Sequence, residues 1–125
     1  KFFSTSASEP FPVFDLILLG MGGDGHTASL FPGTEALDEA SRMAVQNPVP
    51  QLGTVRFTLT FPVINRARNV LFMVAGADKA QALEEVLEGK RRPHLYPSQM
   101  VRPAEGNLTW FLDEAAAGLL TQKNI

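Results

Sequence analysis

The chain has 125 residues, of which 45% are hydrophobic, and this is enough for one domain with a buried core. Its 11 basic and 13 acidic residues give a formal net charge of −2, so no excess of positive charge favours nucleic acid or an anionic membrane as a partner. The sequence contains no cysteine, which excludes disulfides, thiolate catalysis and zinc–thiolate sites and is consistent with a cytoplasmic location.

The first residues predict a connector and a truncated fold. Pro10 and Pro12 prevent a helix in residues 1–12, and no role is assigned to this segment. The chain starts at Lys1 without an initiator methionine, and a strand that looks central to a sheet follows closely. We therefore expect a fragment of a longer protein. No apolar stretch approaches membrane-spanning length, so we expect no membrane partner.

Residues 14–33 join an apolar run to a glycine-rich loop. Leu16–Leu19 lacks polar alternation, which predicts a strand covered on both faces in a parallel sheet. Ligand-binding crevices form beyond the carboxyl ends of such strands, and Asp24 and His26 follow at that place. The loop glycines let the backbone approach a ligand closely, and their N–H groups can bind an anion. These glycines are Gly20, Gly22, Gly23 and Gly25.

The same loop has the spacing G-x-G-x-x-G, which is also the fingerprint of dinucleotide-binding sites. That site requires a long helix after the loop, but Pro32 and Gly33 would stop a helix from His26 after about two turns. It also requires an acidic residue at the end of the next strand, and the region Val45–Asn47 has none. A nicotinamide or flavin site is therefore ranked below a phosphosugar site.

The next elements are short. Thr34–Met43 is predicted to form a surface helix and Ala44–Asn47 a strand. Val55–Thr60 alternates, which predicts a strand with one apolar face and one polar, accessible face. The apolar face holds Val55, Phe57 and Leu59, and the polar face holds Arg56, Thr58 and Thr60.

The second half repeats the order of strand, glycine and helix. Helices are predicted at Phe61–Arg68, Asp78–Glu88 and Ala115–Leu120, buried or partly buried strands at Asn69–Ala75 and Leu108–Asp113, and a loop over residues 90–107. Strands that alternate with helices predict an α/β fold with a mostly parallel sheet flanked by helices, in a Rossmann-like three-layer arrangement.

Four polar side chains are candidates for chemistry. His26 can exchange a proton near neutral pH, and Asp24 could orient its ring, hold a substrate hydroxyl or cap a helix. Arg56 and Lys79 suit anion binding, but the sequence alone slightly favours an exposed helix residue for Lys79, and Arg56 has a similar alternative as a salt-bridged strand residue. His94 and the basic run at residues 90–92 are interpreted as surface, and no residue spacing indicates a metal site.

The loop GMGGDGHTASLFPG, Gly20–Gly33, resembles the signature of the 6-phosphogluconolactonases, and supportive matches follow in the family's order at residues 56–60, 76–80 and 101–113. The related glucosamine-6-phosphate deaminases share the Gly-x-Asp-Gly-His core but continue differently. Thr27–Phe31 therefore favours the lactonase branch, and a deaminase-like isomerase is the alternative enzyme.

The resemblance implies hydrolysis of 6-phospho-D-glucono-1,5-lactone to 6-phospho-D-gluconate in the pentose phosphate pathway, without a metal or an organic cofactor. It implies that His26 is the general base, that Asp24 positions His26 or the sugar, and that Arg56 and Lys79 hold the 6-phosphate. Gly22 and Gly23 belong to the substrate-binding loop that the resemblance implies.

The chain differs from this family by being shorter. Family members carry another α/β half before this one, so residues 1–125 are expected to be the C-terminal portion of a single domain whose N-terminal half is absent. We expect low or no activity for the chain alone. A non-catalytic phosphosugar-binding fragment is the alternative from a different class.

Overall fold

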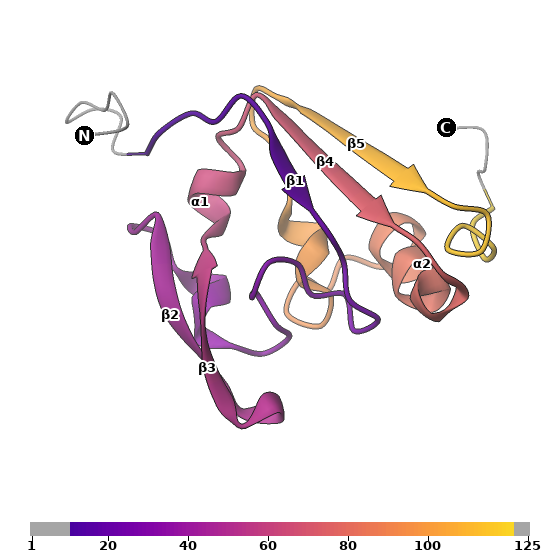
Figure 1. Ribbon diagram of the computed structural model, residues 1–125, viewed down its shortest axis with the longest axis horizontal. Coiled ribbons are helices and arrows are strands. Elements are labelled where there is room, and N and C mark those ends of the chain that lie inside the picture. The colour runs from indigo at the N-terminus through magenta and orange to yellow at the C-terminus, as the bar shows by residue number, and fades with distance from the viewer. Residues whose placement is uncertain (1–10, 122–125) are drawn as a thin grey trace.

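A computed structural model describes residues 11–121, so the connector predicted for residues 1–12 lies almost entirely outside the described part (Figure 1). The strands are β1 Ile17–Leu19, β2 Ala44–Val49, β3 Thr54–Leu59, β4 Asn69–Val74 and β5 Asn107–Leu112. The α-helices are α1 Phe61–Ile64 and α2 Ala80–Glu88. Short 3₁₀ helices are η1 Glu35–Asp38, η2 Pro50–Leu52, η3 Ala77–Lys79 and η4 Pro97–Met100.

Strands β1, β4 and β5 form a parallel sheet in the order β1-β4-β5. Leu19 pairs with Phe72, and Phe72 pairs with Trp110, so one layer of side chains crosses all three strands. This sheet and its helices confirm the predicted α/β class. Strand β1 was predicted to be central, but among residues 11–121 it is an edge strand.

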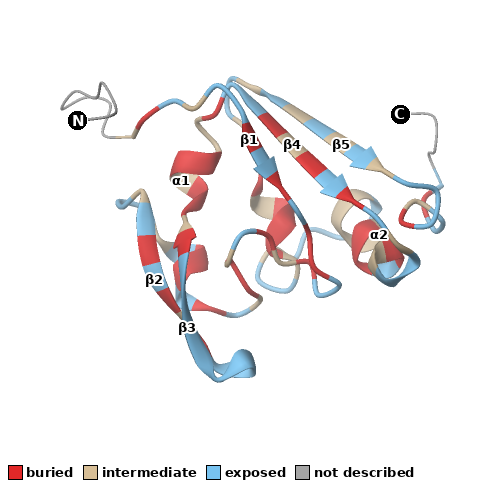
Figure 2. Ribbon diagram, in the orientation of Figure 1, coloured by how far each residue is buried: buried red, intermediate tan, exposed pale blue. Residues whose placement is uncertain are grey.

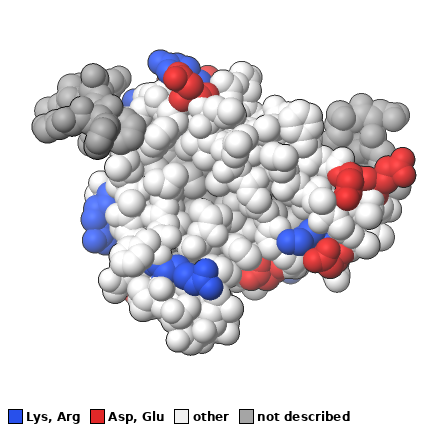
Figure 3. All heavy atoms as spheres, in the orientation of Figure 1, with Lys and Arg blue, Asp and Glu red and all other residues white. Residues whose placement is uncertain are grey.

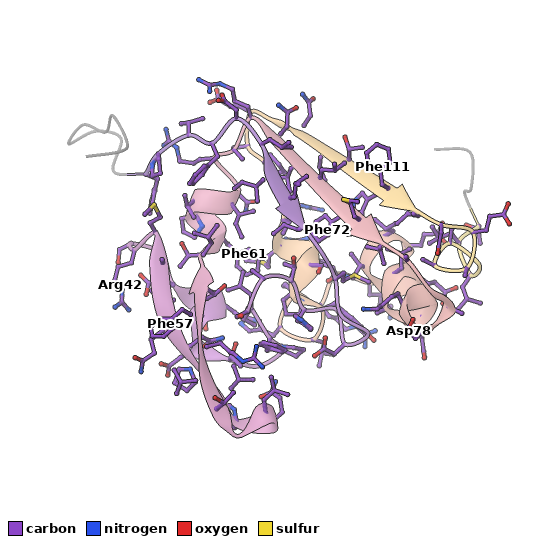
Figure 4. All side chains as sticks on the ribbon, viewed as in Figure 1. Arg42, Phe57, Phe61, Phe72, Asp78 and Phe111 are labelled. Carbon is purple, nitrogen blue, oxygen red and sulfur yellow. The ribbon has the colours of Figure 1, made fainter. Side chains whose placement is uncertain are left out.

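One face of this sheet is covered and the other is open. Ile17, Val70 and Phe72 are buried in the main core with residues of α1 and α2 (Figure 2). On the opposite face Leu18 is 58% exposed and Phe111 is 60% exposed, and Figure 4 shows Phe72 and Phe111 on opposite sides of the sheet. The prediction of strands covered on both faces is therefore wrong for the described residues. The reason is that residues 11–121 place helices against only one face of this sheet.

Strands β2 and β3 form a separate antiparallel hairpin, and Gly53 at its turn has φ 62°. The strand is confirmed, but Val55, Arg56 and Phe57 are all exposed, and burial alternates only from Phe57 onward. The prediction of an accessible polar face is wrong at Thr58 and Thr60, which are buried, while Phe57 is 78% exposed. Thr58 Oγ1 accepts a hydrogen bond from the backbone N–H of Ser29, and Thr60 Oγ1 donates to the carbonyl of Arg42. These hydrogen bonds let the polar face pack against neighbouring loops.

Helix α2 was predicted almost residue for residue, but two other predicted helices are wrong. In place of a helix over residues 34–43 there is only η1, because the Glu39 carboxylate accepts the backbone N–H groups of Ser41 and Arg42 and turns the chain. Residues 115–120 form turns. Asp113 Oδ1 accepts the N–H of Ala116 there, which starts a turn that does not continue as a helix.

Candidate functional site

The glycine-rich loop leaves the carboxyl end of β1 and is held by hydrogen bonds within itself and from outside. The N–H of Gly22 donates to the carbonyl of His26 at 2.9 Å, and Thr27 Oγ1 donates to the carbonyl of Gly20 at 2.7 Å. From η4, Ser98 donates both its backbone N–H and its hydroxyl to the carbonyl of Gly25. The loop therefore has a defined shape before any ligand binds.

His26 and Asp24 form a close pair in this loop. Nδ1 of His26 lies 2.6 Å from Oδ1 of Asp24, and the backbone N–H of His26 donates to the same oxygen at 3.1 Å. The imidazole also stacks on the ring of Phe31, with ring centroids 4.1 Å apart. The His26 side chain is 28% exposed, so one edge of a fixed ring remains open to a ligand.

The charge of Asp24 is stabilised by its neighbour. Burial raises the pKa of Asp24, but hydrogen bonds from the ring and the backbone N–H of His26 outweigh this effect and lower the pKa below its usual value of 3.8. Asp24 is therefore ionised at neutral pH and accepts a hydrogen bond from Nδ1–H of His26. This places the lone pair of a neutral imidazole on Nε2.

The hydrogen bonds from His26 predict how Asp24 titrates in acid. We expect the Asp24 carboxyl, followed by ¹³C NMR, to titrate below pH 3.8, so the stabilisation it gives is present above that pH and is lost as the pH falls through its lower folded-state pKa. In His26→Leu the hydrogen bond from the ring is lost while burial remains, so the pKa should rise. An Asp24 titration unchanged by His26→Leu would contradict the pairing.

Position 22 needs a glycine because the His26 ring packs directly against its backbone. A Cβ atom on Gly22 would lie 2.2 Å from both Nδ1 and Cε1 of His26. We expect Gly22→Ala to displace the imidazole from Phe31 and to destabilise the fold by about 1–3 kcal/mol. The ring-current shift of the His26 protons reports the displacement. Gly20→Ala is the matched control, because no atom lies within 4 Å of a Cβ there, and an equal shift in both variants would contradict the steric explanation.

Lys79 lies beside the loop, at the end of η3. Its ammonium donates to the carbonyl of Met21 at 2.9 Å, and its side chain is half-buried. Gly23 also approaches this segment, because a Cβ there would be 3.4 Å from the backbone oxygen of Asp78. One of the three ammonium donors therefore holds the loop, and two remain for a ligand.

Arg56 lies apart from this cluster, on β3 of the hairpin. It shares a strand face with Thr58, whose hydroxyl contacts Ser29 in the loop region, but the Arg56 side chain is exposed and forms no hydrogen bond or ion pair with residues 11–121. The structure thus brings His26, Asp24 and Gly22 into direct contact and ties Lys79 to the same loop through the carbonyl of Met21, and no hydrogen bond or ion pair with the described residues joins Arg56 to them. On the face drawn in Figure 3, basic side chains form small separate groups.

Two contributors to the site could not be predicted from the sequence. Ser98 holds the Gly25 carbonyl, and Tyr96 packs so closely that a Cβ on Gly25, which has φ +83°, would lie 2.9 Å from its ring. Both residues belong to the segment predicted only as a proline-rich loop. Ser98 and Gly25 are 73 residues apart in the sequence, and no local sequence pattern predicts a hydrogen bond at that separation.

Two further findings concern metals and membranes. Within residues 11–121, no group of three or more His, Asp or Glu side chains is arranged to hold a metal ion. In the same part of the chain, no helix has the length and apolar character needed to cross a membrane. The His94 side chain pairs with Asp38 at 3.2 Å on the surface.

Comparison with known proteins gives consistent matches. Residues 2–110 match the family model described as glucosamine-6-phosphate isomerases/6-phosphogluconolactonase. The chain is 49% identical to a 6-phosphogluconolactonase of Synechocystis sp. over 115 residues, which is 92% of this chain and 46% of the relative, and 48% identical to that of Bos taurus over 88% of this chain and 43% of the relative.

The solved structures agree with the sequence matches. The crystal structure of 6-phosphogluconolactonase from Leishmania guyanensis has 33% sequence identity and a TM-score of 0.78, over 98% of this chain and 47% of that one. The chain thus spans less than half the length of these relatives. By sequence and by fold, the chain belongs to the glucosamine-6-phosphate isomerase/6-phosphogluconolactonase family.

Proposed function

We propose that this chain carries the general base of a 6-phosphogluconolactonase, which hydrolyses 6-phospho-D-glucono-1,5-lactone to 6-phospho-D-gluconate in the pentose phosphate pathway. The observation that carries the proposal is the 2.6 Å pairing of His26 with an ionised Asp24 in the loop after β1. Relatives at 48–49% identity are named 6-phosphogluconolactonase, which supports the same reaction. The absence of cysteine is compatible with a cytoplasmic location.

The proposed chemistry follows from the tautomer that Asp24 fixes. Nε2 of His26 takes a proton from water as the water oxygen attacks the lactone carbonyl carbon. When the bond between this carbon and the ring oxygen breaks, the imidazolium returns the proton to the departing oxygen. The new carboxylic acid then loses its proton to solvent. Asp24 stays ionised throughout and stabilises the imidazolium, because it keeps its hydrogen bond to Nδ1.

Substrate positioning is assigned to the cations and the glycine backbone. The free donors of Lys79 suit the 6-phosphate, and Gly22 and Gly23 allow the sugar to approach the loop backbone. We assign Arg56 to the same phosphate because its guanidinium is not paired with any described residue. Anchoring the phosphate at the far end of the sugar would hold the carbonyl near Nε2.

A chimera tests this function. In it, this chain replaces the matching region of the Synechocystis protein, so that a complete polypeptide is assayed. We expect lactone hydrolysis above the spontaneous rate and no release of ammonia from glucosamine 6-phosphate. Turnover of glucosamine 6-phosphate in preference to the lactone would support the deaminase-like alternative. Binding of 6-phosphogluconate without turnover of either substrate would support a non-catalytic phosphosugar-binding fragment.

We also propose that the open face of the sheet packs against the half of the domain that relatives carry and this chain does not. This face holds Leu18, Met73 and Phe111, each at least 58% exposed, and beside it one edge of β1 pairs with no other strand of residues 11–121. Such apolar patches mark contact surfaces. We expect the chain alone to have low or no activity, and co-expression with the unmatched half of the Synechocystis protein to give a stable complex with lactonase activity. Full activity of the chain alone would contradict this proposal.

A further inference from the structure

A cavity of about 200 Å³ lies between the end of α2, η4 and β5, and it shares no lining residue with the loop at Gly20–Phe31. Its walls are part polar and part apolar, and the apolar part includes Val101, Leu108 and Trp110. The indole ring of Trp110 is fixed because it stacks on Phe72, with centroids 3.9 Å apart and planes within 4°. In another protein a cavity of about 150 Å³ holds one benzene molecule, so this cavity has room for one ring.

Two arginines, Arg91 and Arg102, are among the residues that line the same cavity. Arg91 donates to the carbonyl of Gln99 at 2.8 Å and contacts the sulfur of Met100, and Arg102 makes no side-chain hydrogen bond with the described residues. No carboxylate in residues 11–121 pairs with either arginine. Their positive charges are therefore not paired with a carboxylate in the described part of the chain.

The neighbouring negative groups are occupied elsewhere. Glu85 pairs with Arg92 at 3.0 Å, and Glu88 accepts hydrogen bonds from the backbone and hydroxyl of Thr121. Gln99 Nε2 donates to the carbonyls of Glu85 and Lys90, so the carbonyl end of α2 is partly satisfied.

The backbone that carries Arg102 is held in place. Asn65 accepts a hydrogen bond from the N–H of Arg102 at 2.7 Å and donates to the carbonyl of Met100 at 2.9 Å. The fixed indole ring, the apolar wall and the unpaired cations together form a preorganised site. We infer that this cavity binds a small organic anion, with a single apolar ring against Trp110 and a carboxylate or phosphate between Arg91 and Arg102.

The cavity provides its own reporter, because Trp110 is the one tryptophan of the sequence. The test is a titration of the chain with phenyl phosphate, followed by tryptophan fluorescence. We expect a saturable change, and about tenfold weaker binding in Arg102→Gln. Benzyl alcohol, which lacks the charge, and inorganic phosphate, which lacks the ring, should each bind more weakly than phenyl phosphate.

Two matched variants separate this site from other cations. Arg42→Gln removes an exposed arginine that pairs with Glu39, and Lys79→Gln removes the cation beside the glycine-rich loop; neither should weaken the fluorescence response. Amide shift changes should fall at residues 86–89 and 101–110. A response equal in Arg102→Gln and in the unmodified chain, or shift changes confined to residues 20–31, would overturn the inference. Neither outcome bears on hydrolysis by the chimera, so the two proposals fail independently.

Discussion

We expect His26→Asn in the chimera to lower kcat for lactone hydrolysis by about 10²–10⁴-fold, which is the usual contribution of a general base. The expected loss is in kcat because the variant removes the group that accepts the proton in the transition state, while Lys79 and Arg56 still bind the phosphate. The measurement is steady-state hydrolysis, corrected for the spontaneous opening of the lactone. KM should change much less than kcat.

The matched control is the other histidine of the chain. His94 pairs with Asp38 on the surface, and its side chain is 66% exposed. His94→Asn should therefore leave kcat within about twofold of the parent. If His26→Asn kept most of the parent rate, or if both variants lost activity equally, His26 would not be the base and the proposed mechanism would be wrong.

The largest stability effect should come from Phe72→Ala, which we expect to lower the free energy of unfolding by about 3–5 kcal/mol. Phe72 is fully buried in the central strand and stacks on Trp110, so truncation leaves a cavity that the paired strands cannot close. Urea unfolding of the chain, followed by circular dichroism, measures the change. The fluorescence of Trp110 should also shift, because its stacking partner is removed.

Phe111 offers a control of the same residue type in the same sheet. It is 60% exposed on the open face, so Phe111→Ala should change the free energy of unfolding by about 0.5 kcal/mol or less in the chain alone. In the complex with the unmatched half, where we propose that this face is covered, the same substitution should cost more. Equal destabilisation by Phe72→Ala and Phe111→Ala in the chain alone would contradict the one-sided packing.

The loop pair was predictable because its members are close in sequence. Asp24 and His26 are two residues apart in a glycine frame after an apolar strand, and one hydrogen-bonded turn is enough to join them. Lys79 was predicted as a ligand-binding cation, but its bond to the carbonyl of Met21 spans 58 residues and depends on how β4 lies beside β1. Sequence spacing carries no information about that contact.

For the strands, the sequence pattern predicted alternation but not which side would be buried. At the hairpin strand β3, Thr58 and Thr60 are covered although Arg56 on the same face is exposed, because the two threonines find hydrogen-bond partners in loops far away in the sequence. The continuous apolar runs of β1 and β4 predicted two covered faces. Only one face of these strands is covered among residues 11–121, because coverage depends on which other segments of the protein pack against the sheet.

The bond from Lys79 to Met21 links the phosphate anchor that we propose to the shape of the glycine-rich loop. The ammonium that would bind a ligand phosphate is the same group that holds the backbone carbonyl of Met21, two residues after β1. Replacing this lysine would therefore loosen the imidazole as well as the sugar, and affinity and turnover would decline together. A cation introduced elsewhere to bind the phosphate would restore affinity without restoring turnover.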